Sequence, residues 1–413
     1  MSGRGNAWKW IFWLCLVVLT GLTAAAKISG YWALTALPVG FLFGFFLEKG
    51  DLCGSSAFSE VILMNSWKKI QGIWMVIVVS MLGFAILSGL GLVNLNPKPL
   101  VWASYIVGGI IFGAGMVFAG GCVSGSLYKT GQGNINSMAA LIGIPIGIMM
   151  VEYGPLNLFH KHLRSYIIPN ADGGPVTFTS VFPLPYGVLA VLFASATVLA
   201  FFYRKKGKNK NHKTPDPDTP RLKSILTRKW PPWQAGIAIG ILACFAYLSS
   251  ASTGRNYPLG VTHGVMHANL LLTETNLAYV HGPKPKAPPA FKTGGPQDQT
   301  VPGKKVSVWL MLEIFAMVLG AFVSASLSGR SRLLPKPPGQ TITALFGGSL
   351  VGIGAAIAGG CVVGNIMSGA ALMSVGNILF AAVVILTNWI VTHFYLMGGS
   401  VKDLVWAGSY FKR

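Results

Sequence analysis

Two stretches decide the fold: GGIIFGAGMVFAGGCVSG, residues 108–125, and GGSLVGIGAAIAGGCVVG, residues 347–364. At a fixed offset of 239 residues, ten of their eighteen positions are identical, in the frame G-G-x3-G-x-G-x3-A-G-G-C-V-x-G. The frame gives two of the five cysteines, Cys122 and Cys361, matching surroundings. It predicts two related halves. Internal repeats on this scale are common in transporters, whose substrate site lies where the repeats meet.

The composition is that of a membrane protein. Of the 413 residues, 52% are apolar and only 10% are charged. A helix needs roughly 17–25 residues to cross a bilayer. Ten apolar runs approach or reach this length, three of them short (31–46, 135–151 and 236–248), the others being 8–26, 73–92, 102–119, 188–203, 308–327, 341–358 and 378–397. We predict a polytopic all-α membrane protein, with the first run retained as a helix because no convincing signal-peptide cleavage site follows it.

The basic residues predict topology. The net charge is +21, and ten Lys and Arg fall in RKKGKNKNHKTPDPDTPRLKSILTRK, residues 204–229. A proline-containing basic stretch between apolar blocks is typical of a solvated linker, and the positive-inside rule places it in the cytoplasm. We therefore predict an inner-membrane protein with a first transmembrane half (1–203), a cytoplasmic linker (204–230) and a second transmembrane half (231–413). No nucleic acid is expected; anionic lipid or a cytosolic partner is the alternative ligand of the linker.

Each part of the repeated frame has a physical interpretation. Gly109 and Gly113 are four residues apart, as are Gly348 and Gly352, so each pair lies on a helix face that a neighbouring backbone can approach closely. The Gly-Gly before each cysteine weakens the helix and lets the backbone turn. The apolar segments that follow are too short to span a bilayer. We interpret each as a re-entrant half-helix that begins at its cysteine.

A half-helix beginning inside the membrane predicts an anion site. Irregular backbone survives at that depth only inside protein or beside a cavity, and a helix N-terminus directs free N–H groups and a positive dipole end into it. The thiols then stand at a central pore. The residues predicted to line this path are the two cysteines and their neighbouring glycines, Gly120, Gly121, Gly125, Gly359, Gly360 and Gly364.

A third cysteine belongs with these two. FLFGFFLEKGDLCGSSAFSE, residues 41–60, follows a proline-containing run and predicts a hairpin over 31–64, with Glu48, Lys49 and Asp51 together at its turn. Cys53 is followed by Gly-Ser-Ser, a further candidate half-helix start. Cys15 and Cys244 are embedded in apolar runs, where a free cysteine behaves as a small hydrophobic residue.

The chain resembles the YeeE/YedE-type sulfur-transport family, which includes thiosulfate uptake proteins. The resemblance rests on GFFLEKGDLCG and on the two glycine–cysteine frames, and covers most of both halves. It implies an hourglass-like helical fold in which Cys53, Cys122 and Cys361 line a narrow path and pass thiosulfate along by transient hydrogen bonds. It also implies a small cytosolic sulfur-relay protein as recipient. The family often carries Arg where this chain has Lys49, and the second half has no counterpart of Cys53.

Thiosulfate suits such a path. Its charged oxygens favour helix N–H groups and its soft terminal sulfur suits polarizable thiols, which donate and accept only weakly and so release the ion. The basic residue closest in sequence to either repeated cysteine is Lys129, which we include in the path as a residue that attracts the anion at the pore mouth or reaches the interface.

Several alternatives stay open. A membrane thiol-redox protein also displays cysteines, but the chain has no Cys-x-x-Cys pair. A permease for another sulfur or selenium species, a structural role for the cysteines, and a disulfide between Cys122 and Cys361 are the others. His263 and His267 have metal-ligand spacing without a carboxylate beside them. We predict no catalytic residue, metal site or cofactor, and no phosphate-binding loop for ATP is present.

Overall fold

The computed structural model describes residues 7–171, 173–205, 227–273, 277–280, 304–331, 333 and 337–398. Within these residues, eight helical segments are long and apolar enough to cross a membrane: Trp32–Met64, Lys68–Gly89, Trp102–Gly131, Ile135–Glu152, Pro232–Ser252, Val308–Leu327, Pro338–Ile357 and Val375–Leu396. Two shorter apolar helices accompany them, Val17–Ser29 and Tyr186–Phe201. The predicted polytopic helical membrane protein is confirmed, and each predicted apolar run falls on one of these segments.

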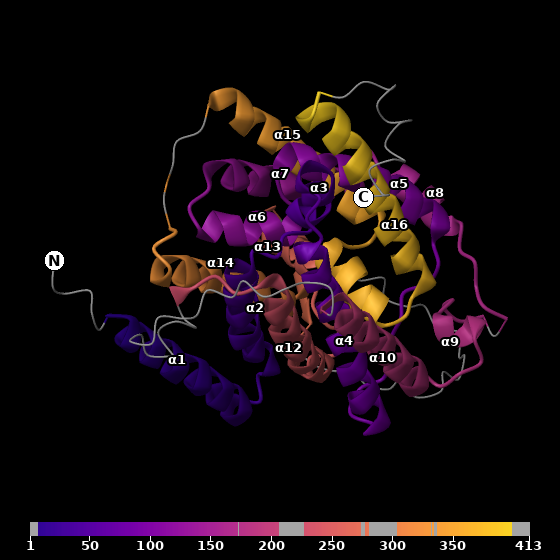
Figure 1. Cartoon of the computed structure of the whole chain (residues 1–413), viewed down its shortest axis with the longest axis horizontal. Helices are drawn as coiled ribbons and strands as arrows, with labels where there is room; N and C mark the ends of the chain where they lie inside the picture. Colours follow the sequence, from indigo (N-terminus) through magenta and orange to yellow (C-terminus); the bar gives the residue numbers. More distant parts are fainter. Residues whose placement is uncertain are drawn as a thin grey trace, which may run out of the picture.

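The first half contains ten α-helices in sequence order. They are α1 (Ala7–Ser29), α2 (Ala36–Gly50), α3 (Gly54–Met64), α4 (Lys68–Gly89), α5 (Trp102–Ala119), α6 (Val123–Gly131), α7 (Ile135–Glu152), α8 (Asn157–Ser165), α9 (Phe178–Val181) and α10 (Tyr186–Lys205), with a short 3₁₀ turn η2 (Trp32–Thr35) before α2. Helix α1 lies at the edge of the molecule, beside η2 and α2 (Figure 1).

The second half repeats much of this order. Its elements are α12 (Pro232–Ser252), α13 (Val261–Thr273), β1 (Leu277–Val280), β2 (Lys304–Ser307), α14 (Val308–Leu327), α15 (Pro338–Ile357), η3 (Val362–Gly369), α16 (Val375–Val391) and η4 (Thr392–Leu396). Segments η3 and η4 are π-helical. Strands β1 and β2 pair in parallel.

Pro, Gly and polar residues predict long loops over residues 155–185 and 276–305. Both segments contain regular structure. Residues 155–185 hold α8 and α9, and α8 packs on α5 and α7. Residues 276–305 begin and end with strand residues of the parallel pair. The linker prediction falls mostly on residues 206–226, which lie outside the described residues. Directly after them, the Trp230 N–H donates to the Lys49 carbonyl at 3.0 Å, so the start of the second half lies at the end of α2.

The two halves interlock through exchanged packing partners. Helix α2 packs on α14 and α12 packs on α4, while α5 packs on α16 and α15 packs on α7. Helices α5 and α15, which carry the repeated frames, pack on each other, as do α2 and α12 (Figure 1). If α2 is exchanged with α12, α4 with α14, α5 with α15 and α7 with α16, the same set of contacts results. This is expected of two related halves.

The glycines of the frame create these contacts. A Cβ at Gly113 would meet the Val384 carbonyl oxygen of α16 at 2.9 Å, and one at Gly352 would collide with the Ile144 carbonyl of α7. The prediction of close backbone approach is confirmed at Gly113, Gly348 and Gly352, whereas Gly109 faces the side chain of Val383. Gly108 and Gly354 belong to a second set, which faces the other frame across the α5–α15 contact.

Candidate functional site

Each of the three selected cysteines stands immediately before a short helix. Cys53 is the N-cap of α3, Cys122 the N-cap of α6 and Cys361 the N-cap of η3, and all three have extended backbone conformations. At Cys122 the sulfur itself caps the helix, because the Gly125 N–H donates to Sγ at 3.4 Å. The short helices therefore begin at the cysteines, as their Gly-Gly and Gly-Ser-Ser contexts predict.

The three helix starts converge. A Cβ at Gly54 would lie 2.7 Å from Cγ2 of Val362, so the first residues of α3 and η3 touch. A Cβ at Gly125 would collide with Sγ of Cys53 and lie 3.4 Å from Sγ of Cys122. The thiols of Cys53 and Cys122 are therefore neighbours. The starts of α3, α6 and η3, each preceded by one of the three cysteines, are thus grouped together from both halves of the chain.

These thiols are closed off from solvent. Cys53, Cys122 and Cys361 are each 0% exposed. All five cysteines are free, so the structure contains no Cys122–Cys361 disulfide. Cys15 and Cys244 are only half-buried, and the Cys244 thiol donates within its own helix, to the Gly240 carbonyl at 3.4 Å. The two cysteines predicted to be ordinary are thus unlike the other three in burial and position.

A lysine binds the first glycine of each Gly-Gly pair. Gly120 and Gly359 both adopt the left-handed conformation, with φ of 64° and 65°, so the helix ends there. The Lys129 ammonium donates to the Gly120 carbonyl at 2.6 Å, and the Lys98 ammonium donates to the Gly359 carbonyl at the same distance. Lys129 thus binds the backbone two residues before Cys122, and its expected role toward the anion or the interface stays a prediction.

A polar network surrounds the turn between α2 and α3, at the end of α2 where Trp230 lies. The Asp51 carboxylate pairs with Lys69 at 2.9 Å and accepts a hydrogen bond from the Tyr128 hydroxyl at 2.9 Å. Glu48, 0% exposed, pairs with Arg330 at 3.0 Å, and the Lys49 ammonium donates to Ser328. The three charged residues of the turn are thus held by side chains from α4, α6 and the end of α14.

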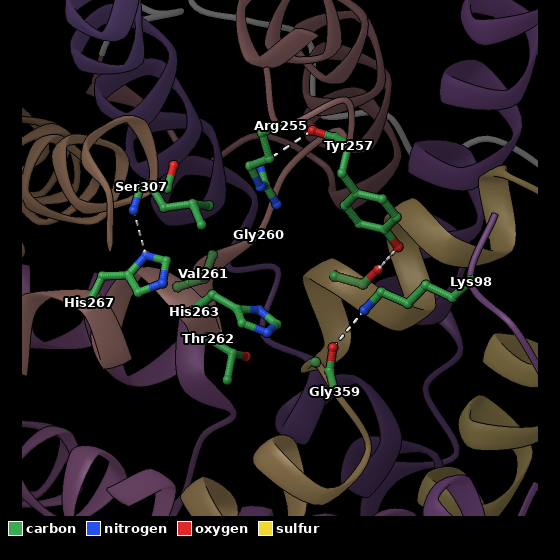
Figure 2. Close-up of a pocket in the computed structure, with 13 residues that line it drawn as sticks. Lys98, Arg255, Tyr257, Gly260, Val261, Thr262, His263, His267, Ser307 and Gly359 are labelled. Carbon is green, nitrogen blue, oxygen red and sulfur yellow. Dashed lines mark hydrogen bonds between the residues drawn. The ribbon is translucent and has the colours of Figure 1, made fainter. Parts of the chain in front are cut away.

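A basic cavity of about 310 Å³ lies beyond the opposite end of α12 (Figure 2). Lys98 and Arg255 line this cavity with their positive charges. The glycines around Cys361 also line it: Gly359, Gly360 and Gly364. A second cavity of about 210 Å³ shares Lys98 and adds Arg164 of α8. Lys129 is the basic residue closest to a repeated cysteine along the sequence. In the folded protein, Lys98 also lies beside a repeated frame, at Gly359.

Sequence reasoning missed Lys98 and Arg255. Lys98 stands in the proline-rich connection before α5 and Arg255 in the turn after α12, and neither belongs to a repeated motif. Tyr257 orders the cavity wall. Its hydroxyl donates to the Gly364 carbonyl at 2.6 Å, and its ring lies 5.1 Å from the Lys98 ammonium and 5.6 Å from the Arg255 guanidinium (Figure 2).

The start of α13 occupies the place in the second half that Cys53 has in the first. Gly260 precedes this helix, and the Arg255 guanidinium fills the space where a side chain at Gly260 would begin. His263 and His267 both line the cavity, and the Ser307 N–H donates to Nδ1 of His267 at 3.3 Å. Across the described residues, no group of three or more potential ligands is arranged to hold a metal ion.

A bundle with eight candidate membrane-spanning helices, buried thiols and a basic cavity is the architecture of a multi-pass membrane protein. The chain matches the family model described as sulphur transport over residues 49–390, which is most of its length. It belongs to this family, and the resemblance inferred from the glycine–cysteine frames is confirmed.

Curated relatives of the chain are transporters. The chain is 30% identical to a protein named thiosulfate transporter TsuA of Spirochaeta thermophila, over 86% of this chain and 96% of the relative. It is 26% identical to the thiosulfate transporter TsuA of Escherichia coli, over 91% and 94% of the two chains. A protein of Escherichia coli named probable transporter YedE is 30% identical over a shorter region, 29% of each chain.

Proposed function

We propose that this protein carries thiosulfate across the inner membrane along a path lined by Cys53, Cys122 and Cys361. The observation that carries the proposal is the convergence of three short-helix starts, each preceded by a buried cysteine, from three separate segments of the chain. The substrate is taken from the names of the two relatives, each of which aligns with this chain over nearly its whole length.

The chemistry of the cluster fits a soft dianion. Free N–H groups at helix starts favour the oxygens of thiosulfate, and thiols match its terminal sulfur while holding it weakly. Because all three thiols are closed off from solvent, passage requires the helix starts to separate transiently, so that the anion moves past the neighbouring thiols of Cys53 and Cys122.

The cysteines provide the test. We expect Cys53→Ala, Cys122→Ala and Cys361→Ala each to reduce thiosulfate uptake at least tenfold in cells that lack other sulfur import, with serine at each position no worse than alanine. Uptake is measured with labelled thiosulfate and normalised to the amount of folded protein in the membrane. Cys15→Ala and Cys244→Ala serve as controls and should leave uptake unchanged.

A thiol-redox function is the second candidate, because the Cys53 and Cys122 thiols are neighbours beside Gly125. A redox pair predicts that loss of either of these two cysteines abolishes activity while Cys361→Ala does not. A purely structural role predicts lower stability with normal transport. Normal thiosulfate uptake by a well-folded Cys122→Ala protein would contradict the proposal that the ion passes along the thiols.

We further propose that the linker faces the cytoplasm and that a small sulfur-relay protein receives the ion there. The concentration of basic residues in the linker supports its cytoplasmic location. The family resemblance supports a small sulfur-relay protein as the recipient of the ion. The polar network around Asp51 lies at the linker end of α2, so in this orientation it is the last protein surface that the ion meets.

A further inference from the structure

The carboxyl group of Glu313 is buried without a partner. Glu313 lies in the second turn of α14, one of the helices long and apolar enough to cross the membrane, and is 0% exposed. Within the described part of the chain, neither of its carboxyl oxygens forms a hydrogen bond and no ion pair includes it. Glu48 and Asp51, by contrast, are paired with Arg330 and Lys69. An ionised group buried without a partner is very costly, so this arrangement suits the neutral acid.

The charged group that acts electrostatically on Glu313 is Arg255. Its guanidinium is held by other partners. It donates to the Pro258 carbonyl at 2.8 Å and to the Tyr257 carbonyl at 3.3 Å, and it lies 5.3 Å from the ring of Trp309. The carboxyl and the guanidinium therefore influence each other's charge without forming a contact ion pair.

The elements packed on α14 bring few other charges near Glu313. Gly40 of α2 rests on the Glu313 backbone, and α2 has no titratable residue before Glu48. Helix α13 contacts α14 one turn nearer its start, at Leu310, and α6 contacts it further along, at Val318. The titratable side chains on the described elements that pack on α14 are His263 and His267 of α13, Tyr128 and Lys129 of α6, and Glu48 and Lys49 at the far end of α2.

Import of thiosulfate needs a source of energy. The ion carries two negative charges and the interior of a cell is electrically negative, so the membrane potential opposes entry twice as strongly as for a monovalent anion. The chain has no phosphate-binding loop for ATP. A proton that enters with the ion cancels part of this charge and adds the energy of the proton gradient. Acidic residues inside membrane helices carry such protons in pumps and transporters.

We propose that Glu313 binds the proton of a thiosulfate–proton symport and that Arg255 couples the two ions, an assignment that rests on the proposed function. Arg255 lines the basic cavity, so an anion that passes there balances the guanidinium charge in place of Glu313. The Glu313 carboxylate then takes a proton from the water on the cavity side. Once the anion has moved on, the guanidinium is free to approach Glu313, which favours the carboxylate, and the proton leaves on the cytoplasmic side. No bond of thiosulfate changes, and each ion favours binding of the other.

Proton movement can be measured in proteoliposomes that contain the purified full-length protein and the pH-sensitive dye pyranine. Potassium on both sides, with valinomycin, holds the membrane potential at zero. We expect an inward gradient of sodium thiosulfate, but not of sodium chloride, to acidify the lumen from an equal starting pH. With equal thiosulfate on both sides and an outside pH one unit lower, one proton per ion should concentrate labelled thiosulfate inside about tenfold.

Variants of Glu313 assign the proton to this residue. Glu313→Gln keeps the shape of the neutral acid but binds no proton. We expect it to unfold at the wild-type temperature and to admit labelled thiosulfate down its gradient, but to lose both the acidification and the accumulation. Glu313→Asp keeps a carboxyl group and should retain both. Glu152→Gln makes the same chemical change at the end of α7, where the side chain is only half-buried, and should behave like the wild type.

A purely structural role for Glu313, as a counter-charge for Arg255, makes a different prediction. Glu313→Gln would then unfold at a lower temperature and slow downhill and uphill uptake equally, which would contradict the proposal. Acidification that persists in Glu313→Gln would overturn it as well. Wild-type uptake without acidification would overturn the symport and leave the thiosulfate path intact. If labelled thiosulfate does not enter the vesicles at all, the proposed function itself fails, and the symport fails with it.

Discussion

Gly125 and Gly364 occupy equivalent positions of the repeated frame, three residues after their cysteines, yet their surroundings differ. A methyl group at Gly125 would collide with Sγ of Cys53, whereas a methyl group at Gly364 would meet nothing within 4 Å. Gly364 borders the basic cavity instead. The same residue type thus makes room for a thiol in one half and keeps a cavity open in the other.

We expect Gly125→Ala to displace the Cys53 thiol and to reduce thiosulfate uptake at least tenfold, with a loss of stability of about 1–3 kcal/mol from overpacking. Gly364→Ala is the matched control for folding and should unfold within about 0.5 kcal/mol of the wild type, because its methyl group has space. Uptake and thermal unfolding are measured on both. An unaffected Gly125→Ala protein would show that the spacing of the two thiols is unimportant.

At this scale the sequence predicts some residues and hides others. The cysteines could be chosen because each follows or precedes glycines in a pattern that signals a break in a helix. Lys98 could not, because its partner, the Gly359 carbonyl, lies in the other half of the chain and a lysine in a proline-rich connection is ordinarily solvated. The equivalence of its bond with that of Lys129 is visible only in three dimensions.

Helices are held together here mainly by small residues that let backbones touch. On α15, Gly348 faces the Ala140 carbonyl and Gly352 the Ile144 carbonyl of α7, with no room for a Cβ at either position. In lipid, where apolar side chains gain little from meeting each other, such close packing is a principal source of helix association. The spacing of four residues made this face predictable.

Replacing one of these glycines should separate α7 from α15. We expect Gly352→Ala to destabilise the protein by about 1–3 kcal/mol, because the added methyl group collides with the backbone and the helices must shift. Gly339, near the start of the same helix, has open space around it, and Gly339→Ala should be neutral or slightly stabilising. Detergent unfolding curves compare the two, and equal stability would contradict the packing account.

Elements without strong periodicity were harder to predict. The segment 155–185 was expected to be a loop because it is rich in Pro, Gly and polar residues. Helix α8 forms within it all the same, since its buried residues His160 and Leu163 face α5 and α7. Its position gives Arg164 access to the second cavity, a role that composition does not signal.

The molecule as a whole is polarised along α12. At one end lie Trp230 and the paired carboxylates Glu48 and Asp51; at the other lies the cavity with its unpaired cations. An anion arriving at the cavity end meets positive charge first. This polarity agrees with import, provided the linker end faces the cytoplasm.

Topology can be measured in intact cells. We expect a reporter inserted at Lys210 to show a cytoplasmic linker. In a background with Cys15→Ala and Cys244→Ala, Lys161→Cys on exposed α8 should react with a membrane-impermeant maleimide added outside. Lys161 serves because α8 also carries Arg164, which lines the second cavity. The opposite labelling pattern would turn the cavity toward the cytoplasm and rule out an uptake role for it.

The exchanged packing of the halves bears on the origin of the chain. Helix α5 has no partner for its Gly113 face within its own half, and α15 has none for Gly352, because each rests on a helix of the other half. A polypeptide of half this length would bury those faces only by pairing with a second copy of itself. The two halves nevertheless differ at their short helices, because Cys53 precedes α3 whereas Gly260, with the Arg255 guanidinium against it, precedes α13, so the two halves are not interchangeable.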